Sequence, residues 1–321
     1  MPRLSSHSPE HMARIFIDGQ AGTTGLEIAT RLSSRDDVEL LTLLDAERKD
    51  ANRRAELLSA ADISILCLPD DAAREAVRLV GDEGRLIDAS TAHRVAPDWV
   101  YGLPELGRAQ REAIKTAHRV ANPGCYPQGF ILLIRPLIEQ GWISVDAALR
   151  CDAVSGYSGG GRQMIEARRA MDEPTREANN TQLYGLHLQH KHVPEMQHYS
   201  GLKRAPIFSP SVAHYHQGML VKIALFAEEV SNKTPIELLE LYRDTYANEV
   251  FIETSLAESF SDDGFLNPTA MNHSNKVQLM VGGHAEQIQL IARYDNLGKG
   301  AAGAAIQNMN LMLGLAETVT L

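Results

Sequence analysis

The chain has 321 residues, of which 44% are hydrophobic and 22% are charged, and its formal net charge is −10. This length allows two domains with separate cores, and the acidic balance excludes partners such as nucleic acid or an anionic membrane surface. No stretch approaches the ~20 apolar residues of a membrane span, and the N-terminal stretch lacks the apolar core of a secretory signal. Three cysteines without paired spacing indicate a reducing, cytoplasmic setting.

After a start that we expect to be poorly ordered over residues 1–12, short apolar strands alternate with helices. The pattern predicts strands over 14–18, 38–44, 62–68 and 85–88, and helices over 26–32, 46–58 and 72–80. Each strand is a nearly continuous apolar run, which is typical of a parallel sheet covered on both faces. The first half therefore predicts a Rossmann-like, doubly wound α/β domain that binds a dinucleotide.

A glycine loop follows the first strand and precedes the first helix, with glycines at Gly19, Gly22 and Gly25. Glycines allow the backbone to approach a pyrophosphate, and the helix N-terminus supplies N–H donors. The alternative is a tight turn without a ligand. Asp45 ends the second strand, and a basic run follows it, comprising Arg48, Lys49, Arg53 and Arg54. This run favours NADP, because basic residues accept a 2′-phosphate, although a charged helix face is also typical of plain solvation.

Cys125 lies between an Asn-Pro-Gly turn and an apolar run over 130–134, which predicts a buried helix starting near Tyr126. The sulfur would then lie at a helix N-terminus, where N–H groups and the helix dipole favour a thiolate. The same donors are suited to an oxyanion that forms on a carbonyl under attack. The position predicts a nucleophile, and the alternative is an inert buried thiol.

The second half predicts longer strands, over 147–154, 211–216, 219–226, 278–282 and 286–294, with helices over 162–171 and 234–246. These runs are typical of a second, mostly antiparallel α+β domain. The last helix, over 300–315, is rich in Ala and Gly, and we expect it to pack back onto the first domain. The NADP-binding domain would comprise 1–124 plus 295–321, and the catalytic and oligomerisation domain 125–294.

Two histidines, His190 and His192, come shortly before Pro194. A neutral imidazole is the natural proton carrier for a thiol near neutral pH, with an ordinary pKa of ~6.5. Because proline favours extended backbone before it, we expect both rings on one face of an extended segment. His192 is the first candidate and His190 the alternative. A second pair, His214 and His216, is expected to be ordinary strand residues, since no third zinc ligand falls at a suitable spacing.

The glycine-rich loop from Ser155 to Arg162 closes a strand and opens a helix. Such a loop can present N–H groups and a guanidinium to a carboxylate or phosphate. The alternative is a flexible turn with an exposed arginine.

These motifs, together with Tyr-Gly-Leu-Pro-Glu at 101–105 and Asp-Asn-Leu-Gly-Lys-Gly-Ala at 295–301, resemble the N-acetyl-γ-glutamyl-phosphate reductases in the shorter of their two forms. The resemblance extends from about residue 14 to residue 315. It implies NADPH-dependent formation of N-acetylglutamate 5-semialdehyde for arginine biosynthesis. The related aspartate-semialdehyde dehydrogenases share the architecture, a cysteine in a similar turn and an acyl-phosphate substrate.

Taken with the resemblance, the motifs assign Cys125 to nucleophilic attack and His192 or His190 to proton transfer. We expect NADP to bind along the first domain and the final motif, at Gly19, Gly22, Thr23, Thr24, Gly25, Arg48, Lys49, Cys67, Pro69, Ser90, Asn296 and Gly300. The substrate, a small anionic acyl phosphate, is expected at Arg94, Asn122, Ser155, Ser158, Gly159 and Arg162, with either arginine on the phosphate.

We expect no metal, and a homo-oligomer, either a dimer or a tetramer. One alternative is the same chemistry on aspartyl or N-acetyl-aminoadipyl phosphate. The other is a catalytically silent NADP-binding regulator that keeps the fold.

Overall fold

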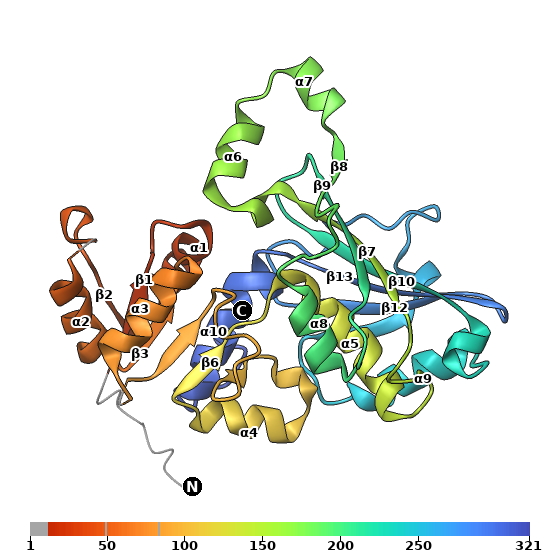
Figure 1. The fold of residues 1–321 in the computed structure, drawn as a ribbon, viewed down its shortest axis with the longest axis horizontal. Helices are drawn as coiled ribbons and strands as arrows, with labels where there is room; N and C mark the ends of the chain where they lie inside the picture. The colour runs from red at the N-terminus through yellow and green to blue at the C-terminus, as the bar shows by residue number, and fades with distance from the viewer. Residues whose placement is uncertain (1–11, 49, 83) are drawn as a thin grey trace, which may run out of the picture.

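The computed structural model describes residues 12–321 except residues 49 and 83 (Figure 1). The expectation for residues 1–12 therefore lies, apart from Met12, outside the described residues. The first sheet is parallel throughout, in the order β2-β1-β3-β4-β6-β5. Its strands are β1 (Ala13–Asp18), β2 (Val38–Leu41), β3 (Ile63–Leu66), β4 (Leu86–Asp88), β5 (Val100–Tyr101) and β6 (Arg119–Ala121).

Helices cover both faces of this sheet: α1 (Thr23–Leu32), α2 (Ala51–Ala60), α3 (Asp70–Val80), α4 (Arg108–Thr116) and α10 (Gly303–Met312). Successive residues of a strand point to opposite faces. Ile15 and Ile17 accordingly pack in one cluster with α1, α4 and α10. Phe16, between them, packs in another with α2 and α3. The predicted doubly wound α/β domain is confirmed, and the C-terminal helix packs on it as expected.

The second sheet has the order β11-β12-β13-β10-β7-β9-β8. Its strands are β7 (Arg150–Gly156), β8 (Thr181–Leu183), β9 (Ile207–Ala213), β10 (Met219–Phe226), β11 (Ile252–Leu256), β12 (Val277–Gly283) and β13 (Gln287–Tyr294). Among the described residues, four strand pairs are antiparallel and two are parallel, β7 with β9 and β11 with β12. The sheet is therefore mixed but mostly antiparallel, and the α+β prediction is confirmed.

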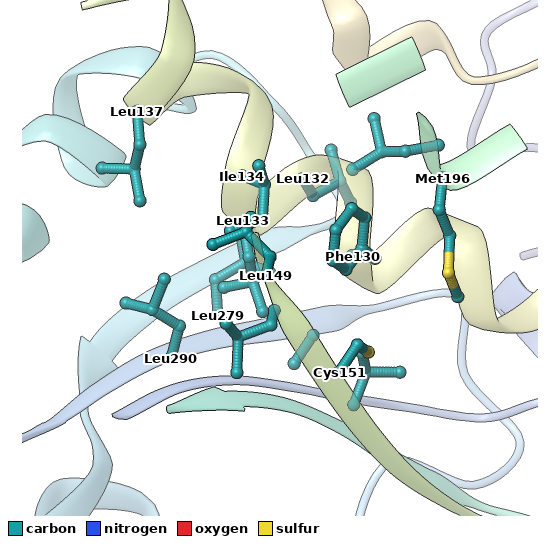
Figure 2. Close-up of a cluster of buried hydrophobic side chains, with 14 of the residues drawn as sticks. Phe130, Leu132, Leu133, Ile134, Leu137, Leu149, Cys151, Met196, Leu279 and Leu290 are labelled. Atoms are coloured by element: carbon teal, nitrogen blue, oxygen red, sulfur yellow. The ribbon is translucent and has the colours of Figure 1, made fainter. Parts of the chain in front are cut away.

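The helices of this second part are α5 (Cys125–Glu139), α6 (Gly161–Arg169), α7 (Glu173–Ala178), α8 (Val193–Ser200) and α9 (Pro235–Thr245). The core lies between α5 and the sheet, because the apolar run of α5 faces Leu279 and Leu290 from β12 and β13 (Figure 2). The segment with α6, α7 and β8 projects away from this core (Figure 1), and α7 has no buried residue.

Several predicted elements have different limits in the structure. The helix predicted over 46–58 is a short 3₁₀ turn, Asp45–Glu47, followed by α2, because the Asp50 carboxylate accepts from the N–H groups of Asn52 and Arg53 and starts a new helix. The strand predicted over 211–216 ends at Ala213, so His214 and His216 lie in the bend before β10 and are not strand residues. The final helix begins with a π-helical turn, Gly298–Ala302.

The carboxyl ends of the parallel strands carry the loops that the sequence singled out. The chain leaves β1 for the glycine loop, β4 for the loop that contains Arg94, and β6 for the turn before Cys125. Ligands of doubly wound sheets bind at this edge. Within the described part of the chain, no helix is both long enough and apolar enough to cross a bilayer.

We expect Gly19→Ala to be far more destabilising than Gly81→Ala, although both glycines have positive φ, +90° and +64°. A Cβ at Gly19 would lie 2.3 Å from the Cys67 carbonyl oxygen, whereas one at Gly81 meets nothing within 4 Å. Backbone strain alone costs roughly 1–3 kcal/mol, and the clash adds to it only at Gly19. Urea unfolding measures the loss of unfolding free energy in both variants. Equal losses would contradict the close contact between Gly19 and the Cys67 carbonyl.

Candidate active site

Cys125 is the first residue of α5, and Gly124 occupies the N-cap without a capping side chain. The Gly124 N–H donates to Glu195 Oε2 at 2.9 Å, and the Tyr294 hydroxyl donates to the Cys125 carbonyl oxygen at 2.6 Å. Gly300 packs closely on the other side, since a Cβ there would lie 3.0 Å from Cys125 Cβ. The thiol is thus held at a helix N-terminus, as the sequence predicted.

Burial dominates the ionisation of this thiol and raises the pKa of Cys125 to about 11. The Arg94 guanidinium and the Tyr126 N–H lower this pKa, but they do not outweigh the loss of water. Burial therefore acts against the thiolate that the helix N-terminus favours. The reaction of this thiol as a nucleophile requires a base.

His192 is buried, and its ring lies against the residue before the cysteine. A Cβ at Gly124 would come within 2.7 Å of His192 Nε2 and within 2.6 Å of Arg94 Nη1. Burial, followed by the charge of Arg94, lowers the pKa of His192 well below its usual range, so the ring is neutral. Its Nδ1 has no hydrogen-bond partner among the described residues. A neutral imidazole beside a protonated thiol can accept the thiol proton.

The segment that carries the two histidines is not extended. His192 has φ −89° and ψ −11° and is the N-cap of α8, with Pro194 in the first turn. A proline is tolerated there because its missing N–H has no partner to lose. The rings of His190 and His192 nevertheless lie 4.7 Å apart, and the His192 N–H donates to His190 Nδ1 at 3.2 Å. Burial lowers the pKa of His190 to about 4.

Arg94 is buried and doubly anchored. Its Nη1 donates to Glu195 Oε1 at 2.8 Å, and its Nη2 donates to the Ala89 carbonyl at 2.9 Å. The Glu195 carboxylate also accepts from the Tyr101 hydroxyl at 2.9 Å. Sequence reasoning assigned no role to Glu195 or Tyr101, although both fall within the motifs that carry the resemblance.

A cavity of about 370 Å³ joins these groups to the start of α1. It brings together the predicted residues Thr23, Thr24, Arg94, Asn122, Cys125, Ser155, Ser158, Gly159, His190, His192, Asn296 and Gly300. The sequence analysis missed other lining residues, among them Tyr126, Met164, Tyr184, Lys191 and Val212. Tyr126 and Lys191 adjoin predicted residues in the sequence. Met164 lies in α6, Tyr184 follows β8 and Val212 lies in β9, and no sequence motif marks these three positions.

Two asparagines of the predicted site connect distant loops. Asn296 donates from Nδ2 to the Ser158 hydroxyl at 2.9 Å and accepts from the Gly218 N–H at 2.7 Å. Asn122 donates from Nδ2 to the Ala301 carbonyl at 3.1 Å. These bonds hold the two halves of the cavity wall against each other.

A second hollow, of about 450 Å³, lies beside the glycine loop and is lined by Gly19, Leu43, Arg48 and Leu68, among others. Gly19 packs tightly on Cys67, and no side chain caps the N-terminus of α1, whose N–H groups are therefore suited to a phosphate. The residues present therefore fit a dinucleotide. Ser90 is buried and donates to Asp88 at 2.7 Å, and Pro69 is the N-cap of α3.

Of the basic run after β2, Arg48 lines this hollow, and Lys49 lies outside the described residues. Arg53 is partly exposed and pairs with Glu56 at 2.7 Å. Arg54 is buried, and its Nη2 forms an ion pair with Asp18 Oδ2 at 2.9 Å, so it connects α2 to β1. Among the described residues of the run, Arg48 lies at this hollow, whereas Arg53 and Arg54 do not line it.

Arg162 does not reach the cavity around Cys125. It pairs with Glu166 at 2.7 Å with most of its side chain exposed. It lines a smaller hollow of about 270 Å³ with Gly22, Thr23 and Cys67, on the glycine-loop side. Burial raises the pKa of the Cys67 thiol to about 12.

The chain matches two descriptions of one protein family: the semialdehyde dehydrogenase NAD binding domain over residues 14–117 and the semialdehyde dehydrogenase dimerisation domain over 125–296. An N-acetyl-gamma-glutamyl-phosphate reductase 2 from Nostoc sp. is 47% identical, covering 96% of this chain and 99% of its own. An N-acetyl-gamma-glutamyl-phosphate reductase from Brucella ovis is 48% identical, with 94% and 99% covered. The chain belongs to the N-acetyl-γ-glutamyl-phosphate reductases of the semialdehyde dehydrogenase family. It is an oxidoreductase.

The fold agrees with solved members of the wider family. An aspartate semialdehyde dehydrogenase from Francisella tularensis superimposes with a TM-score of 0.70 at 15% identity, covering 94% of this chain and 100% of its own. An aspartate semialdehyde dehydrogenase with NADP from Candida albicans gives 0.64 at 13% identity, with 96% and 99% covered. At these identities the likeness shows the shared fold.

The partly buried His190 predicts acid sensitivity. Because the folded state lowers the pKa of His190 from 6.5 to about 4, its contribution to stability is complete above pH 6.5 and is lost as pH falls toward 4. We expect His190→Asn to reduce the fall in the free energy of unfolding between about pH 7 and about pH 4.5, measured by urea titration. The same change at the exposed His118 is the control, and equal falls in the two variants would contradict the assignment.

Proposed function

We propose that the enzyme reduces N-acetyl-γ-glutamyl phosphate to N-acetyl-L-glutamate 5-semialdehyde with NADPH, in arginine biosynthesis, through a thioester on Cys125. The observation that most supports this reaction is the single cavity that joins Cys125, His192 and Arg94 to the start of α1. Relatives named for this substrate match nearly the whole chain.

The first half of the reaction forms the thioester. His192 takes the proton from the Cys125 thiol, and the sulfur attacks the acyl carbon. The bond from this carbon to the phosphate oxygen breaks, and phosphate leaves with the electron pair. Arg94 binds the phosphate charge, and the N–H groups at the uncapped start of α5 stabilise the oxyanion. His190 is the alternative base.

The second half releases the aldehyde. When bound between the glycine loop and Arg48, NADPH supplies the hydride that reduces the thioester. The tetrahedral oxyanion on Cys125 then re-forms its carbonyl, and the carbon–sulfur bond breaks. The thiolate recovers the proton from His192, while the released phosphate takes a proton from water. Thiolate is a good leaving group and a strong nucleophile, so one residue serves both halves.

The charge of the cavity favours an N-acylated substrate over aspartyl phosphate. Among its described lining residues are the cations Arg94 and Lys191 and neither Asp nor Glu. The nearby Glu195 carboxylate is already engaged by internal donors. A free α-ammonium would therefore lack a counter-ion, and an unpaired buried charge is costly. N-Acetyl-aminoadipyl phosphate carries no ammonium either and differs from the proposed substrate in length.

The match to a dimerisation domain over residues 125–296 supports a homo-oligomer. We propose a dimer or a tetramer located in the cytoplasm, where a catalytic thiol stays reduced. We also retain the proposed domain limits, 1–124 plus 295–321 for NADP and 125–294 for catalysis and assembly.

The reverse reaction tests the function directly. With NADP and phosphate, we expect the purified enzyme to oxidise N-acetylglutamate semialdehyde fastest, N-acetyl-aminoadipate semialdehyde more slowly and aspartate semialdehyde slowest. The rate is measured from the absorbance of the NADPH that forms. Cys125→Ser should lower kcat by at least ~10³-fold, the scale of losing a nucleophile, while NADP still binds. A preference for aspartate semialdehyde would overturn the substrate assignment, and no reduction of NADP with any of the three would favour a silent regulator.

Coenzyme choice tests Arg48. We expect Arg48→Ala, alone or with Lys49→Ala, to raise KM for NADPH and leave KM for NADH nearly unchanged. A lost charge-assisted hydrogen bond costs ~1.5–3 kcal/mol, so the preference for NADPH should fall more than about tenfold. Arg53→Ala, which removes the pair with Glu56, is the matched control. An unchanged preference in the Arg48 variants would place the 2′-phosphate elsewhere.

A further inference from the structure

Glu195 is a carboxylate buried at the centre of the site, with its side chain 2% exposed. It lies in α8, three residues after the base candidate His192, yet it makes no hydrogen bond to that ring. Its Oε1 accepts from Arg94 Nη1, and its Oε2 accepts from the Tyr101 hydroxyl and from the Gly124 N–H. Both carboxylate oxygens are therefore engaged by groups other than histidine.

We propose that Glu195 is a positioning residue: it fixes the Arg94 guanidinium and the backbone before Cys125 in one arrangement, and it is not a relay partner of His192. One carboxylate thereby connects the loop after β4, the turn after β6 and α8. These three segments carry the anion-binding, nucleophilic and proton-accepting groups, respectively.

The surroundings of Arg94 support this role. The Tyr199 hydroxyl, one turn after Glu195 on α8, donates to the Arg94 carbonyl at 2.7 Å. The Tyr101 and Tyr199 rings stack with their centroids 3.7 Å apart. Arg94 is thus held by both its backbone and its side chain, while its buried Nε has no hydrogen-bond partner among the described residues. The guanidinium is fixed but retains donor capacity for an anion in the cavity.

The histidine side gives the complementary observation. A relay would require a carboxylate at His192 Nδ1, as in triads where an acid orients the base. His192 Nδ1 is buried without a partner among the described residues. Glu195 is thus close to His192 in the sequence but forms no hydrogen bond with its ring.

The charges around the thiol predict opposite changes in the reactivity of Cys125 for a positioning residue and for a relay partner of His192. Arg94 and Lys191 lower the pKa of Cys125, whereas Glu195 raises it. The rings of His190 and His192 line the same cavity and are neutral. Removing the charge of Glu195 should therefore make the thiol more acidic, whereas removing a relay partner should make it less reactive. A residue that opposes thiolate formation must contribute in another way, and holding Arg94 is the contribution that its contacts show.

The test compares Glu195→Gln with wild type in two measurements. The first is the reverse reaction, which rests on the proposed function; the second is alkylation of Cys125 by iodoacetamide as a function of pH, which does not. We expect KM for phosphate to rise at least tenfold, because a charge-assisted hydrogen bond to Arg94 is lost, and the thiol pKa from alkylation to fall. Slower alkylation with an unchanged KM for phosphate would overturn the proposal and establish a relay.

Tyr101→Phe is the matched control, because it removes one donor to Glu195 and keeps every charge. We expect a several-fold rise in KM for phosphate with the alkylation profile unchanged. Should Glu195→Gln fail to fold, as seen by its melting temperature and NADP binding, Tyr101→Phe decides, and an unchanged KM for phosphate overturns the proposal. A wild-type enzyme inactive with all three semialdehydes would contradict the proposed function alone, since alkylation would still report whether Glu195 acts against the thiolate.

Discussion

The packing of the first turn of α5 against the residues around it is the constraint on which the site depends. The helix starts at the carboxyl edge of the first sheet and continues into the core of the second part, where Phe130 and the leucines after it are fully buried (Figure 2). One helix therefore belongs to both packing units. The residues packed around its start raise the pKa of Cys125 and lower the pKa of His192, while the cysteine remains partly exposed to the cavity. The same burial opposes charge on both groups, so the transfer of the thiol proton to the imidazole depends on the Arg94 guanidinium and the N–H groups at the helix start, which favour the thiolate.

A second buried interaction fixes the opposite wall of the cavity. Lys299 is fully buried and donates from Nζ to Glu105 and Gln307, each at 2.6 Å, while its carbonyl accepts from Gln128 on α5. A buried ion pair contributes little net stability, but it tolerates few alternative arrangements. It orients the turn that places Gly300 against Cys125. The motifs at 101–105 and 295–301, nearly two hundred positions apart, are the two ends of this contact.

The sequence predicted what depends on periodicity and turn chemistry. Alternating apolar strands and helices specified the first domain, and the Asn-Pro-Gly turn placed Cys125 at a helix start. Sequence-based prediction failed where tertiary contacts override local backbone preference. Pro194 suggested extended backbone after His192, but a proline fits the first turn of a helix equally well. Arg54 belonged to a basic run, yet Asp18, thirty-six positions earlier, draws it into the core. Ionisation was equally out of reach, because desolvation depends on which residues cover a group.

An acidic protein can bind an anionic substrate when the carboxylates near the site are paired with internal cations. Glu195 and Glu105, the buried glutamates that brace the site, are each committed to an internal cation, Arg94 and Lys299. Cations therefore line the cavity without competing carboxylates among its described residues. The local field that a ligand meets is set by the Arg94 and Lys191 side chains at short range, because surface charges farther than about 8–10 Å are screened by salt. Selectivity for anions thus follows from the internal pairing of charges and not from the overall balance.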